Sequence, residues 1–225
     1  MPRKFDTQMN ALKGKLLQMG GLVESMVERA MSALVERDER KIEEVLKDEE
    51  RVDRLQIEID EDAVRLLAIQ SPVAFDLRCV LMSARINSEL ERVGDLCVNM
   101  CENVQLLLAE PQLKPLIDLP KMAQVAERML HESLQAFLEQ ASQRAVEVIR
   151  MDDEVDGLND QIFRELLTYM IADTRSITRS LSLILMSRNL ERIADHATNI
   201  AEEVVYLVRG EDIRHQKPPA AGASG

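Results

Sequence analysis

The residues best suited to chemistry in this chain are carboxylates that occur in a repeated pattern. The segment Leu-Glu-Arg-Val-Gly-Asp at 90–95 returns as Leu-Glu-Arg-Ile-Ala-Asp at 190–195, and an Asn and a Glu follow at the same spacing in both copies. At 100° per residue, Glu91 and Asp95 lie within one narrow stripe of a helix, and the second copy behaves identically. The apolar residues of each copy lie on the opposite side. We therefore expect two acidic helix faces that point away from the core.

Each copy is preceded by a second acidic pair with the same four-residue spacing, and the two earlier pairs match each other at an offset of 103 residues. Like charges four residues apart repel by about 0.2–0.5 kcal/mol, so alternating charges would serve solubility better. In an antiparallel helix hairpin, the earlier pair can lie beside the later one. The sequence therefore predicts two sets of four carboxylates: Glu49, Asp53, Glu91 and Asp95, and Asp152, Asp156, Glu191 and Asp195.

Four carboxylates on adjacent helices supply many hard oxygen atoms, and a polyvalent cation would remove their repulsion. We expect divalent or trivalent metal ions, with Mg²⁺, Mn²⁺, Ca²⁺, iron and zinc as candidates. His196 follows Asp195, but Leu96 takes its place in the first copy, so the imidazole is not a common ligand. Cys97 and Cys101 align with alanines in the second copy, which favours buried packing over metal ligation.

Simpler interpretations stand beside the metal hypothesis. A solvated helix face accounts for any single acidic pair. Arg92 and Arg192 lie beside the acidic stripe, where a surface salt bridge is favoured over the orientation of a metal-binding carboxylate. The stripe also carries Asn99 and Asn199, whose contact with a metal the pattern leaves open.

Helical periodicity runs along almost the whole chain in three- and four-residue steps. Ser71-Pro72 breaks it, and the prolines between 110 and 115 form a linker. Gly20-Gly21 marks a bend or a close packing point within the first helix, whose apolar stripe covers 12–34. Asp38 is positioned to cap the second helix, and Gly210 to end the last one. The further helices are predicted at about 38–69, 75–108, 117–139, 144–171 and 177–209.

The repeat divides these helices into two units. Short connections make neighbouring helices antiparallel, so each unit is a three-helix bundle. The sequence therefore predicts an all-α fold of two tandem, pseudo-symmetric three-helix bundles. We place them at 4–110 and 117–210, joined by a linker at 111–116 and followed by a disordered tail at 211–225.

Composition restricts the class of function. Hydrophobic residues make up 46% and aromatic residues 3% of the 225-residue chain, which favours an aliphatic helical core. A net charge of −12 argues against nucleic-acid binding and is compatible with cations or basic protein surfaces. We find no apolar run able to span a bilayer and no apolar signal core at the N-terminus. A cytoplasmic protein follows, and its exposed faces suggest a homodimer.

The sequence resembles the PhoU family, regulators of phosphate uptake in bacteria and archaea. The resemblance covers about 5–209 and rests on Glu-Arg-Val-Gly-Asp at 91–95, Glu-Arg-Ile-Ala-Asp-His-Ala-Thr-Asn-Ile-Ala-Glu at 191–202 and Pro-Val-Ala-Phe-Asp-Leu-Arg at 72–78. It implies two tandem three-helix bundles, with metal ions or multinuclear clusters on the eight carboxylates above. The family's usual Gly-Asp-His is Gly94-Asp95-Leu96 in the first unit, which leaves a histidine role in doubt.

The resemblance also implies a function. PhoU proteins are signalling adaptors between the ATPase subunit of the phosphate ABC transporter and a membrane sensor histidine kinase. They restrain phosphate uptake and the phosphate-starvation response when phosphate is plentiful. If this chain acts in the same way, it is peripheral to the inner face of the membrane through its partners.

Two enzyme classes are the alternatives. A ferritin-like di-metal oxidase uses Glu-x-x-His motifs that face inward, but none of the three histidines follows a Glu at that spacing. An all-α, Mg²⁺-dependent nucleotide pyrophosphohydrolase finds half its acidic pattern in Glu58-x-x-Glu61, and the partner motif is missing. The sequence also has no glycine-rich phosphate loop. We therefore expect a protein that is not an enzyme.

Overall fold

Six long helices and one short 3₁₀ turn form the regular structure of residues 3–213, which the computed structural model describes. The first unit contains α1 (Lys4–Glu36), α2 (Arg40–Gln70) and α3 (Phe75–Leu108). The second unit contains α4 (Asp118–Glu139), α5 (Ser142–Ala172), the turn η1 (Thr174–Ser176) and α6 (Ile177–Arg209). The predicted all-α fold is confirmed.

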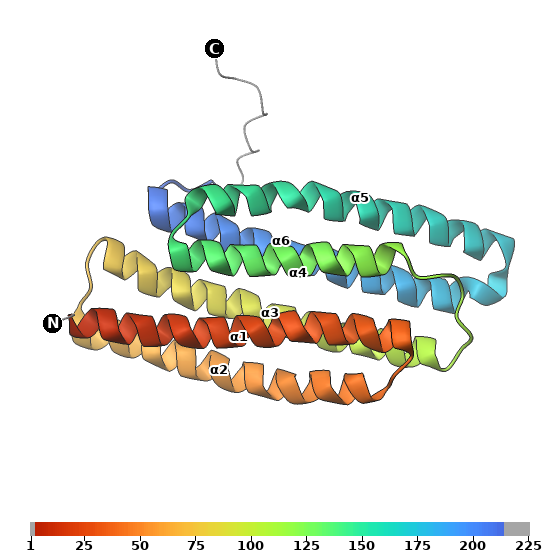
Figure 1. Ribbon diagram of the computed structural model, residues 1–225, viewed down its shortest axis with the longest axis horizontal. Helices are drawn as coiled ribbons and strands as arrows, with labels where there is room; N and C mark the ends of the chain where they lie inside the picture. Colours follow the sequence, from red (N-terminus) through yellow and green to blue (C-terminus); the bar gives the residue numbers. More distant parts are fainter. Residues whose placement is uncertain (1–2, 214–225) are drawn as a thin grey trace, which may run out of the picture.

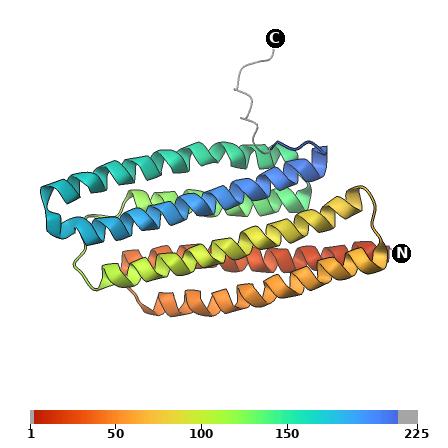
Figure 2. The same cartoon turned by 180° about the vertical axis from the view of Figure 1, so that it is seen from behind.

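The helices lie along the long axis of the molecule and alternate in direction within each unit (Figure 1). The second unit packs beside the first, so that α1 contacts α4 and α3 contacts α6. Both of these pairs are antiparallel. Figure 2 shows the opposite side, where α3 and α6 lie in front of α1 and α4. The two units are thus related by an approximate twofold axis between them, as the internal repeat predicts.

The helix ends follow local sequence signals. Glu39 is the N-cap of α2 and makes no side-chain capping bond, so the predicted cap is displaced by one residue: Asp38 accepts a hydrogen bond from the backbone N–H of Arg40 at 3.1 Å. α2 ends at Gln70, and the next residue, Ser71, has a φ of 43° and leads into Pro72. Gly210 ends α6 with a φ of 71°, a left-handed conformation that costs glycine little. The predicted bounds of α3 and α6 are confirmed, and those of α2, α4 and α5 differ by one or two residues.

The core consists of the apolar stripes of all six helices. Val93, Cys97, Met100 and Val104 are fully buried, on the side of α3 opposite the acidic stripe. This burial confirms the orientation that the helical projection predicts. The core is aliphatic and methionine-rich, and Phe137 is its largest fully buried side chain. Such packing holds the long helices side by side, which fixes the positions of the residues on their outer sides.

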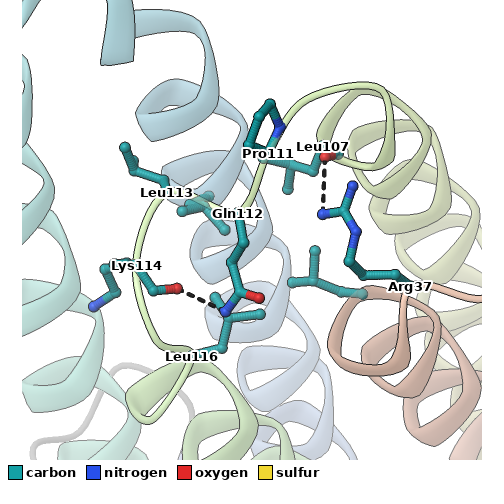
Figure 3. Close-up of a pocket in the computed structure, with 9 residues that line it drawn as sticks. Arg37, Leu107, Pro111, Gln112, Leu113, Lys114 and Leu116 are labelled. Carbon is teal, nitrogen blue, oxygen red and sulfur yellow. Dashed lines mark hydrogen bonds between the residues drawn. The ribbon is translucent and has the colours of Figure 1, made fainter.

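The linker between the units passes over a small cavity of about 20 Å³ at the end of α1 and α3 (Figure 3). Arg37, at the C-terminal end of α1, donates to the carbonyl oxygens of Leu108 at 2.7 Å and Glu110 at 2.9 Å. The guanidinium therefore satisfies carbonyls that the end of α3 leaves without intrahelical partners. The cavity has room for about one water molecule, so it is no binding site for a larger ligand.

Two further expectations concern the ends and surface of the chain. The predicted disordered tail lies outside the described residues except for 211–213, which form no helix. Among the helices of residues 3–213, none is both long enough and apolar enough to cross a membrane.

Candidate metal sites between paired helices

The four predicted carboxylates of the first unit lie together, and we call them the first carboxylate cluster. Glu49 and Asp53 project from α2, and Glu91 and Asp95 from α3. Burial, followed by the charges of Asp53 and Asp95, raises the pKa of Glu49. Burial, Asp95 and Asp53 likewise raise the pKa of Glu91. Because Asp53 and Asp95 each act across the helix pair, the two acidic pairs face each other as predicted.

The second carboxylate cluster has the same arrangement between α5 and α6. Burial, then the charges of Asp156 and Asp195, raises the pKa of Asp152 to about 6. Burial, Asp195 and Asp156 raise the pKa of Glu191, and burial and Asp156 raise that of Asp195. Asp152 and Glu191 are half-buried, while Asp156 and Asp195 are exposed. The burial of the first two and the repulsion among all four carboxylates raise the energy of the ionised cluster.

Both clusters have the chemistry of a hard-cation site. The atoms that they offer are carboxylate oxygens, which suit Mg²⁺, Ca²⁺, Mn²⁺ and iron, and zinc also accepts them. Within residues 3–213, no three or more His, Cys, Asp or Glu side chains are gathered closely enough to hold a metal ion. The carboxylates face one another across each helix pair without closing around one point.

The hydrogen bonds around the two clusters differ. In the second unit, Asn159 of α5 donates to Oε2 of Glu191 at 3.0 Å, and Ser187 of α6 donates to Oδ1 of Asn159 at 2.7 Å. The first unit has a different arrangement. There Asn87 of α3 donates to the carbonyl oxygen of Gln56 at 2.9 Å and to Oδ1 of Asp60 at 3.0 Å. The duplicated carboxylates thus lie in polar surroundings that are not duplicated.

His196 points away from the second cluster and toward the first unit. Its Nδ1 lies 2.6 Å from Oε2 of Glu89 on α3, and Asn199 donates to the same oxygen at 3.0 Å. Sequence reasoning missed Glu89 because its counterpart in the second copy is Asn189, so the repeat gives no signal there. His196 therefore joins the two units.

The arginine beside the acidic stripe and the two cysteines behind it have structural roles. Arg92 forms a surface ion pair with Glu89 at 3.3 Å, as the simpler interpretation predicts. Its side chain is 58% exposed, so the pair contributes little to stability. Cys97 and Cys101 are buried, and burial raises the pKa of Cys101 to about 12, so both are packing residues.

The fold and the candidate sites together define an all-α tandem-repeat protein. It consists of two inverted three-helix bundles, and each bundle carries an acidic cluster on one helix pair, outside the core. A family model described as the PhoU domain matches residues 16–104 and again 119–204, once in each unit. The chain belongs to the PhoU family, and the resemblance noted in the sequence is confirmed.

Named relatives match nearly the whole chain. The "phosphate-specific transport system accessory protein PhoU homolog 2" of Thermotoga maritima is 38% identical over 94% of this chain and 90% of its own length. A "PhoU homolog" of the same description from Caulobacter vibrioides is 36% identical over 96% of this chain and 94% of its own. These names describe accessory proteins, and neither names an enzyme.

Solved structures share the fold. The crystal structure of PhoU from Pseudomonas aeruginosa has a TM-score of 0.89 and 35% identity, covering 92% of this chain and all of that one. The "phosphate transport system regulatory protein PhoU" from Streptococcus pneumoniae has a TM-score of 0.86 and 30% identity, covering 93% and 99%. The arrangement of two inverted bundles is therefore that of the family.

Proposed function

We propose that this protein is a non-enzymatic regulator of a phosphate-specific transport system and a negative regulator of phosphate uptake. Full-length similarity to proteins named as accessory and regulatory components of that system carries the proposal. The fold supports it, because long packed helices offer broad outer surfaces for partners. The partners would be the transporter's ATPase subunit and the sensor histidine kinase of the phosphate response, reached from the cytoplasm.

The second part of the proposal is that both carboxylate clusters bind metal ions. The support is that, in both units, two acidic pairs face each other across a helix pair, so that their charges repel. A bound cation would neutralise the carboxylates and draw the two helices of each pair together. Glu49, Asp53, Glu91 and Asp95 would hold one ion or ion cluster, and Asp152, Asp156, Glu191 and Asp195 the other.

A titration tests the metal sites. Calorimetry with Mn²⁺, Mg²⁺, Ca²⁺, Fe²⁺ and Zn²⁺ on chelator-treated protein, with elemental analysis of the untreated protein, gives affinity and stoichiometry. The double variant Asp95→Asn with Asp195→Asn keeps side-chain size and removes one charge from each cluster. We expect its affinity to fall by at least 10-fold, and unchanged binding of every metal would leave only a solvated acidic face.

A genetic experiment tests the regulatory role separately. Deletion of the gene should leave a phosphate-starvation reporter active in high phosphate, and the wild-type gene should restore repression. Complementation with the double variant then decides whether the carboxylates contribute to repression. Normal repression in the deletion strain would overturn the regulatory proposal. A pull-down with the transporter ATPase and with the sensor kinase identifies the partners, and sedimentation tests the expected homodimer.

A further inference from the structure

The strongest asymmetry between the two units is a hydrogen-bond chain that reaches only one of the clusters. Ser187 of α6 is fully buried and donates to Oδ1 of Asn159 at 2.7 Å. The same Oγ atom lies 3.1 Å from the carbonyl oxygen of Ile184, a second acceptor for its proton. Asn159 in turn donates through Nδ2 to Oε2 of Glu191 at 3.0 Å. The buried hydroxyl of Ser187 thereby orients the amide of Asn159, and this amide in turn orients the carboxylate of Glu191.

This chain restricts the side chain that must reach an ion. A glutamate has three rotatable bonds, and ordering such a side chain costs conformational entropy. The amide of Asn159 occupies one acceptor position of Oε2, and the other positions of the carboxylate stay available. Since Ser187 holds Oδ1 of Asn159, the amide is oriented with its N–H₂ group toward Glu191. The donor therefore orders the carboxylate before any ligand arrives.

The first unit has other residues at these positions, and its hydrogen bonds run elsewhere. Gln56 stands where the second unit has Asn159, and Asn87 stands where it has Ser187. Asn87 donates to the backbone oxygen of Gln56 and to Asp60, whose counterpart is Phe163. Within residues 3–213, no side chain donates a hydrogen bond to Glu91. Glu91 thus keeps rotational freedom that Glu191 lacks.

We propose that Asn159 and Ser187 are positioning residues that preorganise Glu191, and that the second carboxylate cluster is therefore the tighter of two inequivalent metal sites. This inference rests on the proposed metal binding. Outer hydrogen-bond partners of metal ligands typically contribute about 10- to 100-fold to affinity. One ordered ligand among four places the expected difference between the sites at the lower end, at about 10-fold.

The experiment measures each site by itself with Mn²⁺ as the probe. Asp53→Asn with Asp95→Asn disables the first cluster of the full chain, and Asp156→Asn with Asp195→Asn disables the second. We expect the remaining second cluster to bind Mn²⁺ about 10-fold more tightly than the remaining first cluster. In the parent with only the second cluster, Asn159→Ala should weaken binding about 10-fold, and Ser187→Ala should weaken it by a smaller factor.

Matched variants separate positioning from general destabilisation. Asn159 is half-buried on the side of α5 that faces α6. Alanine is a strong helix former, so Asn159→Ala should still fold, and circular dichroism and the metal-free Tm check this. Asn87→Ala in the first unit removes a buried amide at the position matching Ser187. It should lower the metal-free Tm but leave Mn²⁺ affinity of the second cluster unchanged.

The outcomes distinguish the inference from the function on which it rests. No Mn²⁺ binding by either parent would overturn both the metal sites and the positioning role. Binding with equal affinity at the two clusters would overturn the inequivalence alone. Binding that neither Asn159→Ala nor Ser187→Ala weakens would overturn the positioning role and leave the metal sites standing.

Discussion

Gly20 of α1 packs directly against Leu134 of α4, and a Cβ atom at position 20 would lie 2.3 Å from the Leu134 Cδ1 atom. Leu134 is buried between the units, so its side chain has little room to withdraw. Gly21, the next residue, has no atom within 4 Å of the place where its Cβ would be. Gly20 therefore faces a closely packed neighbour, whereas Gly21 faces open space. Only Gly20 sets the distance between the units.

Alanine substitution at these two positions should have opposite effects. Gly20→Ala forces Leu134 out of its position, and overpacking of this kind costs about 1–3 kcal/mol. The gain in helix propensity, about 1 kcal/mol, offsets part of that cost. Gly21→Ala has the same gain and no clash, so it should stabilise the protein by up to about 1 kcal/mol. Urea denaturation at neutral pH measures the free energy of unfolding of both variants.

The comparison of the two variants is informative because both change the same residue type in the same helix. A Gly20→Ala variant as stable as Gly21→Ala would mean that Leu134 moves freely and that the close approach does not restrict the interface. The variant Gly20→Ala with Leu134→Ala tests the origin of any loss. If the clash is the cause, the second substitution should add less than it costs alone.

Periodicity predicts the helices of this chain but not their contacts. The stripe of α1 continues through Gly20-Gly21, and the sequence allows either a bend or a close packing point there. The structure has a single uninterrupted helix from Lys4 to Glu36, and Gly20 is a close packing point within it. The choice depends on Leu134, which lies in another unit, and no pattern local to α1 reports that neighbour.

The candidate site likewise has residues that the sequence predicts and residues that it does not. The carboxylates could be found because they are duplicated and because helical geometry puts each pair on one face. Glu89, Asn159 and Ser187 escaped notice because each has a different residue at its matching position. Their roles depend on which helices meet and at what height, and that register is a tertiary property. Repetition therefore identifies what the two units share, and only the structure identifies what distinguishes them.

Glu89 is expected to be a main polar contact between α3 and α6. Burial raises the pKa of its carboxyl group, but the hydrogen bonds from His196 and Asn199 outweigh burial and lower it overall. Glu89→Ala removes both bonds to an ionised acceptor, and hydrogen bonds to charged groups contribute about 1.5–3 kcal/mol. We expect a loss of unfolding free energy in that range at pH 7, measured by urea denaturation.

The second unit offers the control for this prediction. Asn189→Ala changes the matching position of α6 and should alter stability by no more than about 0.5 kcal/mol. A double-mutant cycle of Glu89→Ala and His196→Ala isolates the contact itself. Strictly additive losses would show that the imidazole and the carboxylate do not stabilise each other.

Metal removal should lower the stability of the wild-type protein if the proposed sites are occupied. An ion present at 100 times its Kd stabilises the native state by about 2.7 kcal/mol. For a chain of this size that corresponds to a Tm change of about 5–10 °C. Thermal scans with excess Mn²⁺ and with a chelator measure the change. The variant Asp95→Asn with Asp195→Asn binds more weakly, so its Tm should change less between the two conditions. A wild-type protein whose Tm is the same with Mn²⁺ and with the chelator would contradict the prediction.

The seam between α1 and α4 is expected to become stronger as pH falls. Glu24 lies 3.3 Å from Nδ1 of His131, and the approximate twofold axis relates this pair to Glu127 and Glu28. One side of the seam thus pairs a carboxylate with an imidazole, while the other places two carboxylates together. Burial, then the charges of Glu28 and Glu24, raises the pKa of Glu127. Arg128 lines the same surface depression.

The sign of the pH dependence follows from that raised pKa. Below the unfolded pKa of Glu127 the group is protonated in both states, so its native environment costs nothing. As pH rises through the native pKa, the group ionises beside other carboxylates, and stability is lost. Glu127→Gln should therefore stabilise the protein at pH 7.5, by about 0.2–0.5 kcal/mol for each like-charge neighbour. The difference from wild type should disappear near pH 4.

Two further variants complete this test. Glu43→Gln removes an exposed carboxylate of α2 and should not reproduce the gain at pH 7.5. Glu28→His builds on one side of the seam the carboxylate–imidazole pair that the other side already has. It should stabilise the protein at pH 6, where the new imidazole is charged, more than at pH 8, where it is neutral. The Tm of Glu127→Gln and the Tm of the wild type are measured from pH 4 to 8. If the difference between the two Tm values is the same at every pH, the repulsion across the seam is negligible.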